Sequence, residues 1–223
     1  MDLQATTPTS TLLDDAFVIE NFFGLKLIAD LWQELEQFPA GEDFVDQHGI
    51  FKGQLIANQT FIDSNKAGIC LTEILKKVRD HLGIPVTWRE IDFVKLYLPW
   101  DIHCDLVRSD ADRPFYNALI PLHDVDSRTV IFNETSPGYN HFWQYKNEHA
   151  KSSNPVPRDV WDKYLSMCWP EDREYLSVKS IMPVQRAGQL IMFKRNLWHS
   201  SDSFHLSGAA PKYFLQLIID RDD

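Results

Sequence analysis

The chain has 223 residues, of which 44% are hydrophobic and 24% are charged, and this is the balance of an ordinary globular domain. Its formal net charge of −10 disfavours binding to nucleic-acid backbones, and no apolar stretch approaches the length of a membrane span. The three cysteines, Cys70, Cys104 and Cys168, are widely spaced, which argues against a disulfide framework or a zinc cluster. The N-terminus has no signal-peptide pattern, so we expect a cytoplasmic protein with neither nucleic-acid nor membrane partners.

Residues 1–13 are rich in Thr, Ser and Pro and predict a flexible N-terminus, followed by a single domain over 14–223. Two helices come first in that domain. Apolar residues recur at steps of three and four over 24–38 and again over 66–82, where Gly83 ends the second helix.

The pattern then changes to β-branched and aromatic residues, which are typical of strands. Strands are predicted at 86–98, 116–122, 129–133, 175–184, 188–193 and 213–219. A long insertion at about 134–172, with a short helix near 157–167, is either a lid over a site or a subdomain packed on the surface. Two helices followed by unevenly spaced strands predict a β-rich α+β fold with a two-sheet jelly-roll core.

A pair of metal-binding residue types follows the first strand. Residues two apart on an extended chain point to the same side, so His103 and Asp105 can face one metal ion while Cys104 faces away. An imidazole and a carboxylate suit Fe(II), and two His plus one carboxylate leave open positions for other ligands. Alone, His-x-Asp is a weak signal that also occurs in surface turns, and a Cys104 thiolate is an alternative ligand.

A second segment offers the third ligand. A glycine turn opens the short strand at 188–193, a polar turn follows, and His199 then stands where the next strand starts. His205 is its rival. Thirteen residues beyond His199, Lys212 enters an apolar strand, where a buried ammonium needs an anionic partner unless it reaches solvent at the strand end.

These features together resemble the Fe(II)/2-oxoglutarate-dependent dioxygenase superfamily, above all its prolyl-hydroxylase-like and phytanoyl-hydroxylase-like branches. The resemblance covers roughly residues 86–220 without the insertion, and the stretch 188–201 is its most specific part. It implies a double-stranded β-helix, a cupin-like jelly roll, flanked by the N-terminal helices. It also implies Fe(II), 2-oxoglutarate and O₂ as reactants, with His103, Asp105 and His199 as the iron ligands.

In the same resemblance Lys212 pairs with the distal carboxylate of 2-oxoglutarate, although many relatives place this basic residue nearer to ten positions past the histidine. Trp100 and Tyr97 are candidates for a further co-substrate contact, because relatives often have a Tyr three residues before the first ligand. A glycine usual in that region is missing here, so the alignment there is loose. Thr129 is another candidate for binding the co-substrate.

The implied reaction is hydroxylation of a C–H bond in a small molecule or an amino-acid side chain, with release of succinate and CO₂. Several side chains could contact the substrate: Arg108, Asn117, Arg128, Phe132 and Trp143. Arg128 could equally be an exposed turn residue. Two other functions remain open, namely a cupin-type metalloenzyme that does not use 2-oxoglutarate and a non-catalytic jelly-roll module that binds a ligand.

Overall fold

The computed structural model describes residues 15–37, 41–46, 49–57, 65–105, 116–139, 141–209 and 211–222. The flexible N-terminus predicted for 1–13 lies outside these ranges. The helices are α1 Leu25–Leu35, α2 Asn65–Leu82, α3 Phe142–Glu148 and α4 Arg158–Tyr164, with 3-10 helices η3 Pro170–Tyr175 and η4 Phe204–Ser207. None of the helices in these ranges is long and apolar enough to cross a lipid bilayer.

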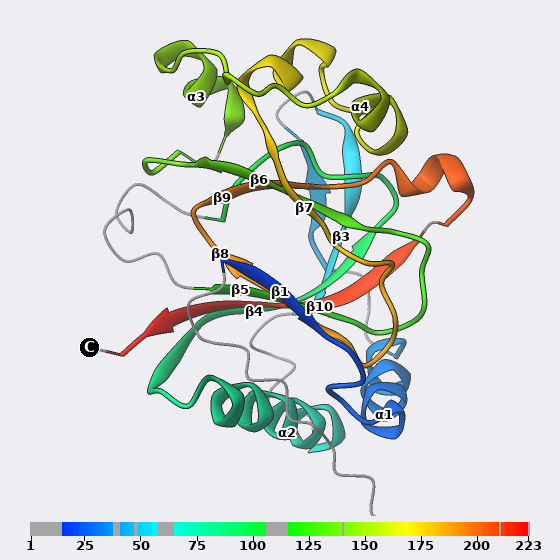
Figure 1. Cartoon of the computed structure of the whole chain (residues 1–223). Coiled ribbons are helices and arrows are strands. Elements are labelled where there is room, and N and C mark those ends of the chain that lie inside the picture. The colour runs from blue at the N-terminus through cyan, green and yellow to red at the C-terminus, as the bar shows by residue number, and fades with distance from the viewer. Residues whose placement is uncertain are drawn as a thin grey trace, which may run out of the picture.

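Two antiparallel sheets face one another in this part of the chain (Figure 1). The large sheet has the order β1-β8-β5-β10-β4-β3-β2 and the small sheet the order β7-β6-β9. The strands are β1 Ala16–Ile19, β2 Asp43–Val45, β3 Phe51–Ala57, β4 Val86–Leu96, β5 Tyr116–Pro121, β6 Thr129–Thr135, β7 Val178–Ile181, β8 Leu190–Lys194, β9 Leu197–Ser201 and β10 Lys212–Arg221. The β-rich α+β jelly roll predicted from the sequence is therefore confirmed.

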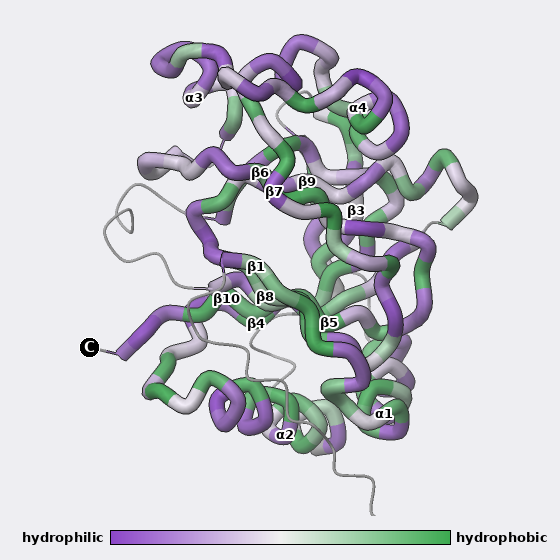
Figure 2. Tube along the Cα trace, viewed as in Figure 1, coloured by the Kyte–Doolittle hydropathy of each residue, from purple (hydrophilic) through white to green (hydrophobic). Residues whose placement is uncertain are grey.

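The alternation of side chains along β10 explains the layers. Leu215 and Leu217 pack outward against the helices, whereas Phe214 packs inward between the sheets. Helices α1 and α2 cover the outer face of the large sheet (Figure 1), because their apolar stripes need a partner surface. In Figure 2 the strands of the large sheet are largely hydrophobic, whereas α2 alternates between hydrophobic and hydrophilic residues.

The predicted insertion forms the excursion between β6 and β7. It carries α3, α4 and η3 over the small sheet (Figure 1), and residues such as Phe142, Trp161 and Leu176 form a separate hydrophobic cluster with Trp198 of β9. The strand predicted at 175–184 is shorter than expected: β7 spans only Val178–Ile181, and residue 175 belongs to the 3-10 helix η3. Strands β1, β2 and β3 and helix α3 were not predicted.

Candidate metal centre and its cavity

Backbone pairing brings the two histidines together. His103 lies beyond the end of β4, and its N–H donates to the carbonyl of His199 on β9 at 3.0 Å, while the reciprocal bond measures 2.9 Å. The two imidazole rings are consequently 4.3 Å apart between centroids. Asp105 follows two residues later, so the predicted trio converges from two segments that are far apart in the sequence.

The three side chains form a compact group of potential metal ligands. Nε2 of His199 lies 3.3 Å from Oδ2 of Asp105, and Nε2 of His103 lies 3.9 Å from Oδ1. One ligand atom from each residue falls within 4.8 Å of the others. His205, the rival of His199, lies in η4 and is not part of this group.

A hydrogen bond at Nδ1 of each imidazole ring fixes the direction in which Nε2 points. Nδ1 of His103 lies 2.6 Å from the carbonyl oxygen of Asp101, and Nδ1 of His199 lies 3.0 Å from that of Leu197. Since a carbonyl can only accept, each Nδ1 carries the proton and each Nε2 keeps its lone pair for a metal ion. The residues present therefore fit a divalent ion of the Fe(II) type.

The protonation states agree with that fit. Burial lowers the pKa of His103 to about 4, and the neighbouring His199 adds to the effect. Burial alone would raise the pKa of Asp105, but the two histidines and the amide of Asn117 outweigh it and lower the value to about 2. At neutral pH the site thus offers a neutral His103 imidazole and an ionised carboxylate, which are the forms that bind metals.

The hydrogen bonds of Asp105 and Cys104 show that these two side chains point to opposite sides of the chain. Asn117 of β5 is fully buried and donates a hydrogen bond from Nδ2 to Asp105. Cys104 faces the other way, where its thiol donates to the carbonyl of Tyr139 at 2.6 Å inside the cluster beneath the insertion. The alternation predicted for this segment is therefore observed, and the thiol does not face the metal ligands.

Lys212 opens strand β10 with a buried ammonium. Only 1% of the residue is exposed, and Nζ donates to Oγ of Ser201 at 2.8 Å. Within the described ranges Asp202 is the carboxylate that acts on Lys212, yet no ion pair joins the two side chains. Burial lowers the pKa of Lys212 to about 8. The ammonium does not reach solvent at the strand end, and an additional anion would stabilise it.

One cavity of about 230 Å³ joins the three ligands to Lys212. Other residues that line it are Phe44, Glu90, Asp92, Val94, Leu96, Trp100, Asn117, Leu119, Thr129, Ser201, Phe214 and Gln216. Of the residues predicted to bind the co-substrate, Trp100 and Thr129 therefore line the cavity together with Lys212. Tyr97 does not, because its ring packs against Phe51 and the ammonium of Lys95.

The residues that were predicted to contact the substrate do not lie together in the structure. Asn117 lines the cavity, but Phe132 is fully buried in the cluster beneath the insertion and Arg128 donates to the carbonyl of Met182 at 3.3 Å. Neither Phe132 nor Arg128 is among the residues that line the cavity, so their positions do not support a role in substrate binding. Arg108 lies outside the described residues.

Trp143 lies in a second, larger cleft of about 790 Å³, between the insertion and the segment that carries His103. Trp100 and His103 border both the cleft and the inner cavity. The insertion contributes eight residues to the lining of the cleft and also forms the hydrophobic cluster with Trp198. The eight are His141, Phe142, Trp143, Lys146, Cys168, Trp169, Glu171 and Asp172. The insertion is thus packed on the small sheet and also borders the cleft beside His103, and its role as a lid stays a prediction.

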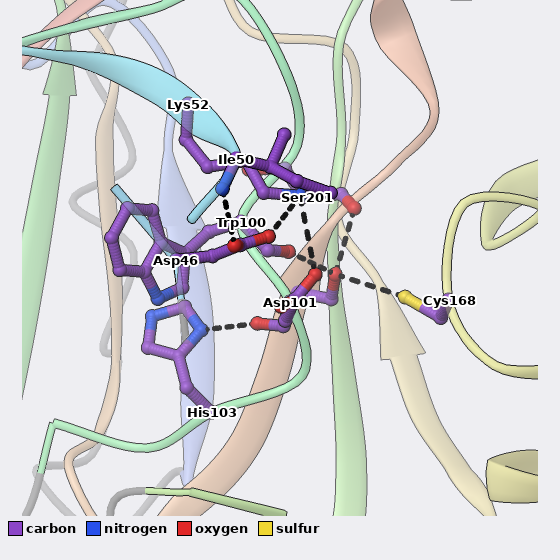
Figure 3. A network of polar contacts seen from close by, with 9 residues as sticks. Asp46, Ile50, Lys52, Trp100, Asp101, His103, Cys168 and Ser201 are labelled. Atoms are coloured by element: carbon purple, nitrogen blue, oxygen red, sulfur yellow. Dashed lines mark hydrogen bonds and ion pairs between the residues drawn. The ribbon is translucent and has the colours of Figure 1, made fainter. Parts of the chain in front are cut away.

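A charged network that was not predicted supports the first histidine. Lys52 of β3 is buried, and its Nζ lies 3.3 Å from a carboxylate oxygen of Asp46 and 3.3 Å from one of Asp101 (Figure 3). Asp101 also supplies the carbonyl that holds Nδ1 of His103. The signal for this network in the sequence is weak, because Asp46 and Lys52 precede Asp101 by about fifty residues.

Comparisons with known proteins support the fold. No model of a known protein family and no curated protein sequence matches the chain. The epimerase SnoN from nogalamycin biosynthesis, which is alpha-ketoglutarate-dependent, is 13% identical with a TM-score of 0.62 over 94% of this chain and 79% of its own. HygX from Streptomyces hygroscopicus, solved with nickel and 2-oxoglutarate bound, is 14% identical with a TM-score of 0.56 over 93% and 83%.

A prolyl-4-hydroxylase from Pseudomonas putida is 11% identical, with a TM-score of 0.54 over 95% of both chains. The chain therefore has the fold of the Fe(II)/2-oxoglutarate-dependent oxygenase superfamily, and the resemblance predicted from its motifs is confirmed at the level of the fold. A group of residues that could hold a metal, His103, Asp105 and His199, lies within that fold.

Proposed function

We propose that the protein is an Fe(II)- and 2-oxoglutarate-dependent oxygenase that oxidises a C–H bond of a small molecule. The observation that carries this proposal is the shared cavity, in which the group His103, Asp105 and His199 opens onto the buried ammonium of Lys212. A metal site alone would fit many reactions. A metal site that shares a cavity with a buried cation, which has no ion pair among the described residues, fits a co-substrate that carries a carboxylate at its far end.

His103, Asp105 and His199 would hold the iron on one face, and Asn117 would keep the carboxylate of Asp105 oriented through its hydrogen bond. Lys212 would bind the distal carboxylate of 2-oxoglutarate, assisted by the hydroxyl group of Ser201, to which it already donates. Apolar side chains such as Phe214 and Leu119 line the space between these groups and exclude water.

When bound, iron and 2-oxoglutarate supply the oxidising power, with O₂ consumed and succinate and CO₂ released. The contribution of this chain is to hold both groups in a fixed geometry and to place the substrate beside the iron. Hydroxylation is the outcome that we propose. The similar structures include an epimerase and a carbocyclase as well as a hydroxylase, so the product must be identified by mass.

The cupin-type alternative without 2-oxoglutarate is less well supported, because such an enzyme has no use for a buried ammonium in the cavity. Succinate formation from 2-oxoglutarate, with Fe(II) and O₂ and without added substrate, tests the proposal directly. We expect slow, iron-dependent succinate formation by the wild type and none by His103→Ala. Iron-independent succinate formation, or equal rates in the two proteins, would contradict the proposal.

A further inference from the structure

The two ends of the cavity carry side chains of opposite charge. Lys212 and Gln216 lie four residues apart on β10, so their inward side chains are about 13 Å apart along the strand. On β4, Leu96 pairs with Lys212, and Asp92 pairs with Gln216. One end of the cavity therefore carries an ammonium, while the other carries the carboxylate of Asp92.

Exposure identifies the carboxylate end as the mouth. Lys212 is buried, Asp92 is half-buried, and Glu90, which lines the same cavity two residues before Asp92, is exposed. Residues two apart on a strand point to the same side, so Glu90 and Asp92 form one acidic wall. A molecule that enters the cavity at this end passes the acidic wall before it reaches Lys212.

The acidic wall lacks a counter-ion among the described residues. Burial raises the pKa of Asp92 to about 6, and the carboxylates of Glu90 and Asp105 contribute further. Neither Asp92 nor Glu90 forms an ion pair within the described ranges, and Arg89, the cation nearest in sequence, pairs with Asp220. A positive charge placed in the mouth would relieve this repulsion.

An independent feature points to a ligand at the same place. Asn117 is fully buried, lines the cavity, and donates from Nδ2 to Asp105. That bond fixes the orientation of its amide, because a carboxylate can only accept. Among the residues that the structure describes, none donates a hydrogen bond to the amide oxygen Oδ1, and a buried acceptor of this kind is stabilised by a donor from a ligand.

We infer that the mouth of the cavity binds a substrate that carries an alkylammonium group, with Asp92 and Glu90 as its counter-ions and Asn117 Oδ1 as an acceptor for a neighbouring N–H or O–H. This inference rests on the proposed function, since it places the substrate on the side of the metal opposite to 2-oxoglutarate. The same charges keep the two molecules apart. The dianionic co-substrate is repelled by the acidic wall, and a cationic substrate is repelled by Lys212.

The test uses the full chain loaded with Ni(II) and 2-oxoglutarate, which prevents turnover. Calorimetry would compare two amines, 6-aminohexanol and glucosamine, with their N-acetyl derivatives. We expect each amine to bind at least about tenfold more tightly than its neutral derivative, as a charge-assisted contact requires. The double variant Asp92→Asn with Glu90→Gln should lose this preference. The double variant Glu36→Gln with Glu73→Gln, at two exposed positions, serves as the control for net charge.

Binding of 2-oxoglutarate to the same Ni(II)-loaded proteins distinguishes failure of the proposed function from failure of the inference about the substrate. If the wild type does not bind 2-oxoglutarate, the proposed function fails. If it binds 2-oxoglutarate but prefers the N-acetyl derivatives, or shows no preference for the amines, the inference on the substrate fails. The double variant should bind 2-oxoglutarate no more weakly than the wild type, which would show that it is folded. An amine preference that survives in this variant would also overturn the inference.

Discussion

The ammonium of Lys52 lies 3.3 Å from a carboxylate oxygen of Asp101, the residue whose backbone carbonyl fixes Nδ1 of His103. A buried cation on β3 thus holds the segment that presents the first metal ligand. Asp46 provides the second carboxylate at the same distance, and its side chain is only 4% exposed. The orientation of His103 therefore depends on a charge network that contains none of the three candidate ligand side chains.

Replacing Lys52 with Met should weaken binding of Ni(II) by about 10- to 100-fold, the usual effect of removing a group that orients a ligand. It should also destabilise the fold by about 3–5 kcal/mol, because a buried carboxylate loses its partner. Lys52→Arg should restore most of the metal affinity. Metal titration by calorimetry and thermal melts measure the two effects.

Lys26→Met is the matched control, since it removes a lysine from an exposed ion pair with Asp30 and should leave both stability and metal affinity nearly unchanged. A Lys52→Met protein that is less stable but binds Ni(II) as tightly as the wild type would show that the network supports only the fold.

The affinity for 2-oxoglutarate should depend on the protonation of Lys212. Its pKa in the free protein is about 8, below the ordinary value of 10.5, because burial disfavours the charged form. Below pH 8 the ammonium is present and binds the carboxylate. As the pH rises above 8 a proton must be taken up on binding, and the affinity falls by up to about tenfold per pH unit.

Calorimetry of the Ni(II)-loaded protein between pH 7 and 9.5 measures this dependence. Lys212→Arg should bind with an affinity that hardly changes over this range, because the guanidinium stays charged. Lys212→Met should bind weakly at every pH. An equally steep fall for wild type and Lys212→Arg would assign the titration to another group.

The glycine turn before β8 should be intolerant of side chains. Gly188 has φ of +83°, and a Cβ there would come within 2.7 Å of the carbonyl oxygen of Phe23. Gly188→Ala should therefore destabilise the protein by about 2–4 kcal/mol in chemical unfolding. Gly208 has φ of +77° with open space around it, so Gly208→Ala should cost only about 1–2 kcal/mol. Equal costs would mean that contact with Phe23 is unimportant.

The fold and the metal group could be predicted because each depends on a local pattern. Alternation places His103 and Asp105 on one side of the chain, and the glycine turn before β8 precedes His199. Helices α1 and α2 follow from their apolar periodicity. Lys212 could be singled out because a lone cation in an apolar strand is costly to bury.

The remaining features depend on contacts between distant segments. The contact of Lys52 with Asp101 arises only when β3 packs beside the segment after β4. Asp46 is close to Lys52 in the sequence, but no local pattern indicates that this lysine is buried. Phe132 was expected near substrate but packs under the insertion, because alternation alone does not say which side of β6 faces the cavity. Tyr97 is turned away by its contact with Phe51.

The most direct measurement of the central claim is the titration of 2-oxoglutarate into Ni(II)-loaded protein, compared among wild type, His199→Ala and His205→Ala. Both variants remove one imidazole, but only His199 belongs to the metal group. We predict that 2-oxoglutarate binds in a metal-dependent manner to the wild type and to His205→Ala, and that His199→Ala loses this binding. Metal-independent binding by the wild type, or unchanged binding by His199→Ala, would contradict the claim.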